Sequence, residues 1–248
     1  MLKKRIIGVV TVMGNTAVQS FGYKKYLPLG DPSILIENLD KWGADEILLQ
    51  IIDRSKKNND PHFSLIEKVS NMGLSTPLIY SGGIHSVESG IKAISKGADR
   101  IIIDNILRTN SKIVSELSES LGTQAVIGCL TLGIANNKIQ LYDYIKKTYS
   151  DIDDQIINIV DNKIISEVLI VDFQNEGLPD SFNIDLINKL PFKDPSLILF
   201  GGISIAKTIN EYFLRDNIKA VGIGNFLNYR EDSIYKFKKS IKDLYIRI

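Results

Sequence analysis

Eight short apolar runs alternate with longer amphipathic segments along this chain of 248 residues. The runs are continuous, whereas a strand with one exposed face would alternate apolar and polar residues. Continuous runs of this length are typical of parallel strands that are covered on both faces. They span residues 5–12, 46–52, 77–80, 100–104, 125–131, 167–173, 196–200 and 220–224.

The segments between these runs predict helices. Asp31 is placed to cap the first helix, and Pro32 suits its first position. Further helices are expected over residues 62–72, 86–97, 111–122, 151–164, 182–190 and 204–214. Strands that alternate with helices form a parallel sheet, and eight such units in this length predict a closed (β/α)8 barrel, the TIM barrel. An open, doubly wound sheet is the structural alternative.

The second half of the chain echoes the first. Residues 43–49 resemble residues 164–170, and residues 77–84 resemble residues 196–203, at nearly equal offsets. We therefore predict a single domain over residues 1–248, built from two half-barrel repeats at about 1–121 and 122–248. Residues 134–150 interrupt the pattern after the fifth strand, and we expect an inserted loop or small hairpin over the barrel mouth.

The composition excludes several classes of protein. Lys and Arg number 30 against 29 Asp and Glu, so no strong basic field favours nucleic acid. No stretch of about 18 apolar residues could span a membrane. One cysteine and two histidines argue against a disulfide framework or a metal site, and no cofactor is implied. The N-terminal apolar run is short and lacks a cleavage site, which predicts a cytoplasmic protein.

Two glycine pairs follow the third and seventh predicted strands. Ligands of this fold bind at the C-terminal ends of the strands, and glycine lets backbone N–H groups approach an anion. We therefore predict two phosphate sites on opposite sides of the mouth, with tight turns alone as the alternative. The predicted residues are Gly82, Gly83 and Asn105 in one half, and Gly201, Gly202, Gly224 and Asn225 in the other.

Motifs spread along nearly the whole chain resemble the cyclase subunit of imidazole glycerol phosphate synthase, in the histidine biosynthesis family. They include the opening Met1–Ile7, Gly30-Asp31-Pro32, Gly43-Ala44-Asp45-Glu46, Gly82–Glu88 and Gly97-Ala98-Asp99-Arg100. The resemblance implies a two-phosphate barrel that receives ammonia from a partner glutaminase, a class I amidotransferase, within a heterodimer. It also matches Gly177 to a phosphate-binding glycine after strand six, and Asp99 to an aspartate that contacts the glutaminase.

The resemblance breaks at the catalytic positions. The family uses two aspartates as general acid and base at the ends of strands one and five, and this chain has Thr11 and Thr131 there. A threonine hydroxyl cannot shuttle protons near neutral pH as a carboxylate does. Asp104 is the one carboxylate expected to lie inward and high on a strand, so it is the main acid–base candidate, with Gln50 beside it.

The resemblance also implies a charged ring that gates ammonia entry at the bottom of the barrel. Arg5, Glu46, Arg100 and Glu167 match that ring. The alternation of side chains along a strand points each of them inward below an apolar layer. A purely structural salt-bridge plug is the alternative interpretation.

Three functions remain open. The first is an enzyme, a synthase or lyase subunit that uses ammonia to amidinate a nucleotide-linked acetamido sugar in surface-polysaccharide biosynthesis. The second is the histidine-pathway cyclase itself, which forms imidazole glycerol phosphate. The third is a non-catalytic scaffold that binds a partner or a phosphorylated ligand.

Overall fold

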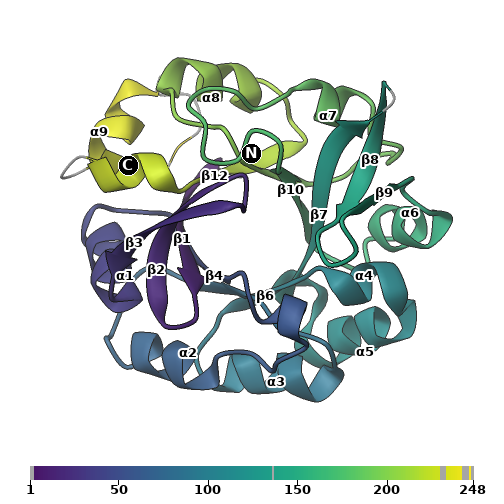
Figure 1. The fold of residues 1–248 in the computed structure, drawn as a ribbon, viewed down its shortest axis with the longest axis horizontal. Helices are drawn as coiled ribbons and strands as arrows, with labels where there is room; N and C mark the ends of the chain where they lie inside the picture. The colour runs from purple at the N-terminus through teal and green to yellow at the C-terminus, as the bar shows by residue number, and fades with distance from the viewer. Residues whose placement is uncertain (1–2, 136, 230–232, 242–245, 247–248) are drawn as a thin grey trace.

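Eight parallel strands pair side by side and close into a barrel, seen end-on in Figure 1. The computed structural model describes residues 3–135, 137–229, 233–241 and 246. Pairing of β7 with β10 joins the two ends of the sheet, so the open-sheet alternative is wrong. The barrel strands are β1 (Arg5–Met13), β4 (Glu46–Ile51), β5 (Leu78–Ser81), β6 (Arg100–Ile103), β7 (Val126–Ala135), β10 (Glu167–Asp172), β11 (Leu197–Phe200) and β12 (Ile218–Ile223).

Helices surround the barrel, and every predicted helix is present, although most are shorter than expected. The Asp31 side chain caps α1 as predicted, accepting a hydrogen bond of 2.9 Å from the Ser33 backbone N–H. The predicted helices are α1 (Pro32–Lys41), α2 (Phe63–Ser70), α3 (Val87–Ser95), α5 (Ser111–Leu121), α6 (Asp154–Asp161), α7 (Asp185–Asn188) and α8 (Ala206–Phe213). Two helices, α4 (Asn105–Thr109) and α9 (Ser233–Ser240), were not predicted.

The apolar residues divide into two cores. One fills the space between the barrel and its helices. The other fills the barrel interior and includes Ile7, Val9, Leu48, Ile102 and Leu169. These five residues lie at the strand positions predicted to face inward, so the alternation of side chains along the strands is confirmed.

Two antiparallel hairpins extend the sheet at the C-terminal ends of its strands. Strands β8 (Lys138–Asp143) and β9 (Thr148–Ser150) continue β7, which confirms the hairpin expected within residues 134–150. A second hairpin, β2 (Thr16–Phe21) and β3 (Lys25–Gly30), follows β1 and was not predicted. Both hairpins border the barrel mouth (Figure 1).

Within the described parts of the chain, no helix combines the length and apolar content that crossing a bilayer requires.

Candidate active site

A cavity of about 680 Å³ opens at the C-terminal ends of the barrel strands. Three of the four candidate catalytic residues, Gln50, Asp104 and Thr131, line it together with Gly82. The fourth, Thr11, is not on the described cavity wall. It is 6% exposed, and its hydroxyl lies 3.5 Å from the Gln50 side-chain oxygen, so it supports Gln50 from behind. The interpretation of Thr11 as a group that reaches substrate directly therefore needs correction.

Asp104 lies at the end of β6 and starts α4. One carboxylate oxygen accepts a hydrogen bond of 2.6 Å from the Asn105 backbone N–H, and the Tyr144 hydroxyl donates to the other. Tyr144 comes from the turn between β8 and β9 and lines the same cavity. Burial, followed by the Asp104 carboxylate, raises the pKa of Tyr144, so the phenol remains a proton donor at neutral pH.

Cys129 also lines the cavity. Burial is the main cause that raises the pKa of its thiol to about 12, so it stays protonated and unreactive at neutral pH. In the part of the chain that the structure describes, no group of three or more His, Cys, Asp or Glu side chains could hold a metal ion.

A first side pocket, of about 280 Å³, lies beside the cavity near α3 and α4. It brings together Gly83 and Asn105, as predicted, with His85 and Thr109. Gly83 has a φ of +76°, and a Cβ there would lie 2.4 Å from the Asn59 carbonyl oxygen, so only glycine fits. Gly82 instead lines the central cavity.

A second side pocket, of about 250 Å³, lies at the ends of β11 and β12. Its wall contains all five residues predicted for this half: Gly177, Gly201, Gly202, Gly224 and Asn225. The Asn225 side-chain amide is already used, since its nitrogen donates to the Ser20 carbonyl at 2.6 Å and its oxygen accepts from the Ser20 N–H. Only the backbone of Asn225 is therefore free to bind a ligand here.

Glu176 lies at the edge of this second pocket and is 3% exposed. Its carboxylate accepts hydrogen bonds from the Ser20 hydroxyl at 2.9 Å and from the Tyr23 N–H at 3.1 Å. Burial raises the pKa of Glu176 above its ordinary value, and these hydrogen bonds oppose the shift. The contacts fasten the β2–β3 hairpin to the loop that follows β10.

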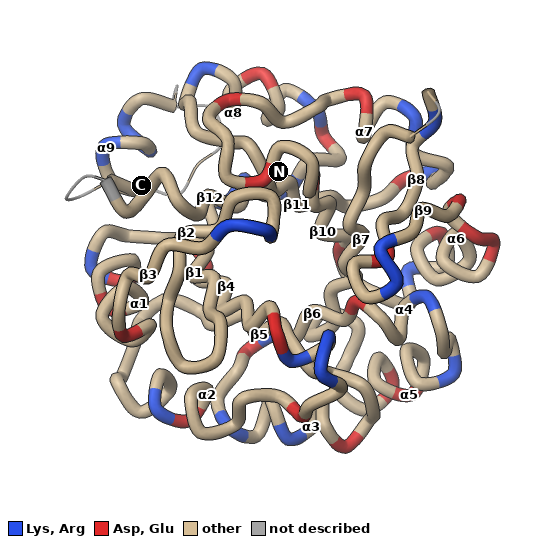
Figure 2. Tube along the Cα trace, in the orientation of Figure 1, with Lys and Arg blue, Asp and Glu red and all other residues tan. Residues whose placement is uncertain are grey.

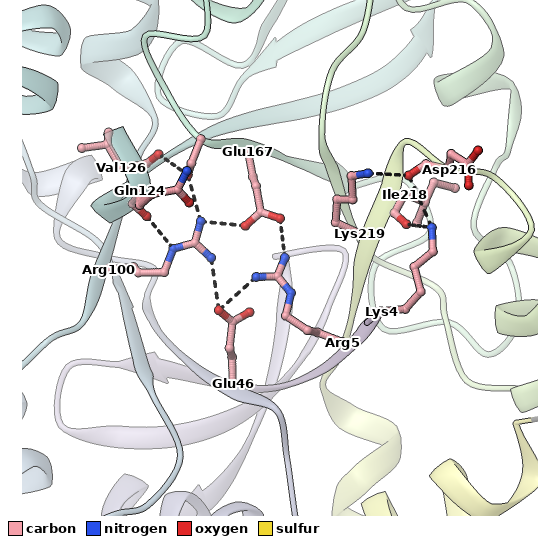
Figure 3. Close-up of polar contacts among 11 residues, drawn as sticks. Lys4, Arg5, Glu46, Arg100, Gln124, Val126, Glu167, Asp216, Ile218 and Lys219 are labelled. Carbon is pink, nitrogen blue, oxygen red and sulfur yellow. Dashed lines mark hydrogen bonds and ion pairs between the residues drawn. The ribbon is translucent and has the colours of Figure 1, made fainter. Parts of the chain in front are cut away.

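Four charged side chains form a closed ring at the opposite, N-terminal end of the barrel (Figure 3). Arg5 binds Glu46 at 3.2 Å and also pairs with Glu167. Arg100 binds Glu46 at 3.1 Å and Glu167 at 2.6 Å. The side chains are 8–19% exposed, and burial raises the pKa of Glu46 while both arginines oppose it. The structure thus brings together all four residues that the sequence placed at the barrel bottom.

Asp99 lies next to this ring in the sequence and is exposed. Its carboxylate accepts a hydrogen bond of 2.7 Å from the Leu78 backbone N–H. One carboxylate oxygen of Asp99 therefore fixes the start of β5, and its role toward a partner stays a prediction.

Sequence analysis missed several residues of the central cavity. They are the two hairpin tyrosines Tyr23 and Tyr144 and three lysines, Lys24, Lys56 and Lys147. The tyrosines and two of the lysines sit in the turns of the hairpins, where no periodic pattern reports which way a side chain points. The concentration of Tyr and Lys within residues 142–149 is the one signal that could have drawn attention to them.

The closed barrel, with a cavity at the C-terminal ends of its strands, defines a protein of the (β/α)8 class, whose ligands bind at that end. The chain belongs to the histidine biosynthesis protein family, whose model matches residues 5–233.

Several curated relatives are similar over almost their full length. The imidazole glycerol phosphate synthase subunit HisF of Thermotoga sp. (strain RQ2) is 24% identical, covering 98% of this chain and 96% of its own. HisF of Methanococcus vannielii is 26% identical, with 98% and 97% covered. A Vibrio vulnificus protein provisionally named subunit hisF2 is 24% identical, with 100% and 92% covered.

Proposed function

We propose that this chain is a cyclase-like subunit of a glutamine amidotransferase complex and uses ammonia made by a partner glutaminase. The observation that carries the proposal is the closed Arg–Glu ring on the barrel axis, opposite a substrate-sized cavity. Between them lies an interior of apolar side chains. Ammonia is small and neutral, so an opened ring and an apolar interior suit its passage better than that of water or ions.

The altered catalytic positions support a changed acceptor. Thr11 and Thr131 replace the two aspartates that the resemblance implies, and Asp104 is the remaining carboxylate on the described cavity wall. In this proposal Asp104 takes the proton from the attacking nitrogen, and Tyr144, hydrogen-bonded to it, donates toward the departing oxygen. Gln50 and Thr131 orient the acceptor from the neighbouring strands.

We propose a nucleotide-linked acetamido sugar of surface-polysaccharide biosynthesis as this acceptor. Ammonia forms a C–N bond to the acetamido carbonyl carbon, and the C–O bond breaks to leave an amidine. The oxygen leaves as water, or as phosphate if a nucleoside triphosphate activates it first. The side pockets would hold phosphate groups of the substrate through their backbone N–H groups, with Gly83 and Asn105 on one side and Gly201 and Gly202 on the other.

The histidine-pathway cyclase is the second candidate. It is favoured by the two glycine-lined pockets on opposite sides of the cavity, which suit a substrate with a phosphate at each end. The loss of both aspartates argues against it.

The test supplies the purified chain and its glutaminase with glutamine carrying heavy nitrogen in its amide. One reaction contains a nucleotide-linked acetamido sugar, with and without a nucleoside triphosphate, and another contains the histidine-pathway ribonucleotide. Mass spectrometry should find heavy nitrogen in an amidine of the sugar. Turnover of the ribonucleotide without any amidine would contradict the proposal and favour the cyclase.

A further inference from the structure

Three lysines from three separate loops converge on the central cavity. Lys24 lies in the β2–β3 turn, Lys56 in the short helix η1 (Ser55–Lys57) after β4, and Lys147 in the β8–β9 turn. Figure 2 shows basic segments bordering the opening at these three places. The two side pockets, by contrast, contain no Lys or Arg among their described lining residues. Positive charge is therefore concentrated at the centre of the mouth.

These mouth lysines have no anionic partner in the described chain. None of the three makes an ion pair, whereas the adjacent Lys57 binds Asp53 at 2.9 Å. The one carboxylate on the described cavity wall, Asp104, is already bound by Tyr144 and the Asn105 N–H. The charge at the mouth is thus left for a ligand to neutralise.

The lysines also stand close enough to affect one another. Burial and, next, the charge of Lys147 lower the pKa of Lys56, while Asp53 opposes the shift. The Lys56 ammonium lies 5.7 Å from the centre of the Tyr144 ring. Like charges held together across a cavity are unfavourable without a bound anion, so an anion between them would be stabilised.

We propose that Lys24, Lys56 and Lys147 form a third anion site, between the two side pockets, that binds a diphosphate group of the acceptor. Three positive charges on three loops match the several negative charges of a diphosphate better than those of a single phosphate. The inference rests on the proposed function in taking the central cavity as the acceptor site. It deepens that function by requiring an internal diphosphate rather than two terminal phosphates alone.

Calorimetric binding of inorganic pyrophosphate and inorganic phosphate tests this site without any turnover. Two charge-matched double variants are compared, Lys56→Gln with Lys147→Gln, and Lys57→Gln with Lys146→Gln. The second pair flanks the first in the sequence and is absent from the described cavity wall. All four side chains are exposed, so both variants should unfold at the wild-type temperature.

Wild-type protein should bind pyrophosphate more tightly than phosphate. The K56Q/K147Q variant should lose about tenfold in pyrophosphate affinity, and the K57Q/K146Q variant less than about threefold. Lys24→Gln should show a smaller loss in the same direction. Equal losses in both double variants, an unchanged affinity in K56Q/K147Q, or an equal loss for phosphate and pyrophosphate would each overturn the proposal. Because no ammonia transfer is measured, this result is independent of the amidine assay.

Discussion

Removal of one carboxylate from the floor ring should destabilise the barrel far more than loss of a surface ion pair. Glu167 contacts both Arg5 and Arg100 and its side chain is 10% exposed. The Glu167→Gln variant leaves Glu46 to balance two guanidinium groups. Leaving a buried charge without its partner costs about 3 kcal/mol of unfolding free energy.

Urea unfolding followed by circular dichroism at pH 7 measures this cost. The matched control is Glu37→Gln, which breaks the exposed pair between Glu37 and Lys41, whose side chains are 48% and 64% exposed. That change should cost less than about 0.5 kcal/mol.

A charge-balanced double variant separates charge from lost contact. Replacing Glu167 and Arg100 together by Met leaves Arg5 paired with Glu46 and adds apolar surface, so it should cost less than Glu167→Gln alone. The reasoning is refuted if Glu167→Gln costs no more than Glu37→Gln, or if the double Met variant is the less stable of the two.

Three further predictions concern the mouth. Asp104→Asn and Tyr144→Phe should each lower kcat of the complex about a hundredfold while acceptor binding changes little, because they remove the proton route; weakened binding with normal kcat would argue for a purely positioning role. Gly201→Ala should destabilise the protein by about 1–3 kcal/mol, since its φ is +104° and a Cβ would lie 2.5 Å from a backbone carbonyl oxygen. Gly14→Ala, at a φ of +62° in open space, should cost less in thermal unfolding, and equal costs would contradict the packing argument. Burial raises the pKa of Glu176 above 4.5, so the folded protein holds that proton more tightly and wild-type stability falls as pH rises through the raised pKa. Glu176→Gln removes this fall, so its stability relative to wild type should rise between pH 4.5 and 7; a constant difference would show that the Glu176 pKa is not raised.

The barrel could be predicted from the sequence because its strands are buried on both faces and read as continuous apolar runs. Side-chain alternation then placed Glu46 and Gln50 on the inner face, at opposite ends of β4. The same logic explains why the β2–β3 hairpin was missed. Four of the six residues of β3 are exposed and two are partly buried, so the strand leaves no apolar signature.

The glycine pockets could be anticipated because their positions follow from strand ends alone. The polar network above them could not be. Tyr144 reaches Asp104 only because the β8–β9 hairpin folds back over the mouth, and Glu176 holds Ser20 across a large separation in sequence. Such contacts depend on how loops pack in three dimensions, and no local periodicity encodes them.

The floor ring also has a consequence for how the chain assembles. Arg5, Glu46 and Arg100 lie in the first half of the sequence, and Glu167 lies in the second. A nascent chain that has made only its first half therefore carries two cations and one anion at this point, with no fourth member to close the circuit. Contacts of such long sequence separation form late in folding. Closure of the ring marks the moment at which both halves have met, so the same four charges proposed to admit ammonia also bind one half of the barrel to the other.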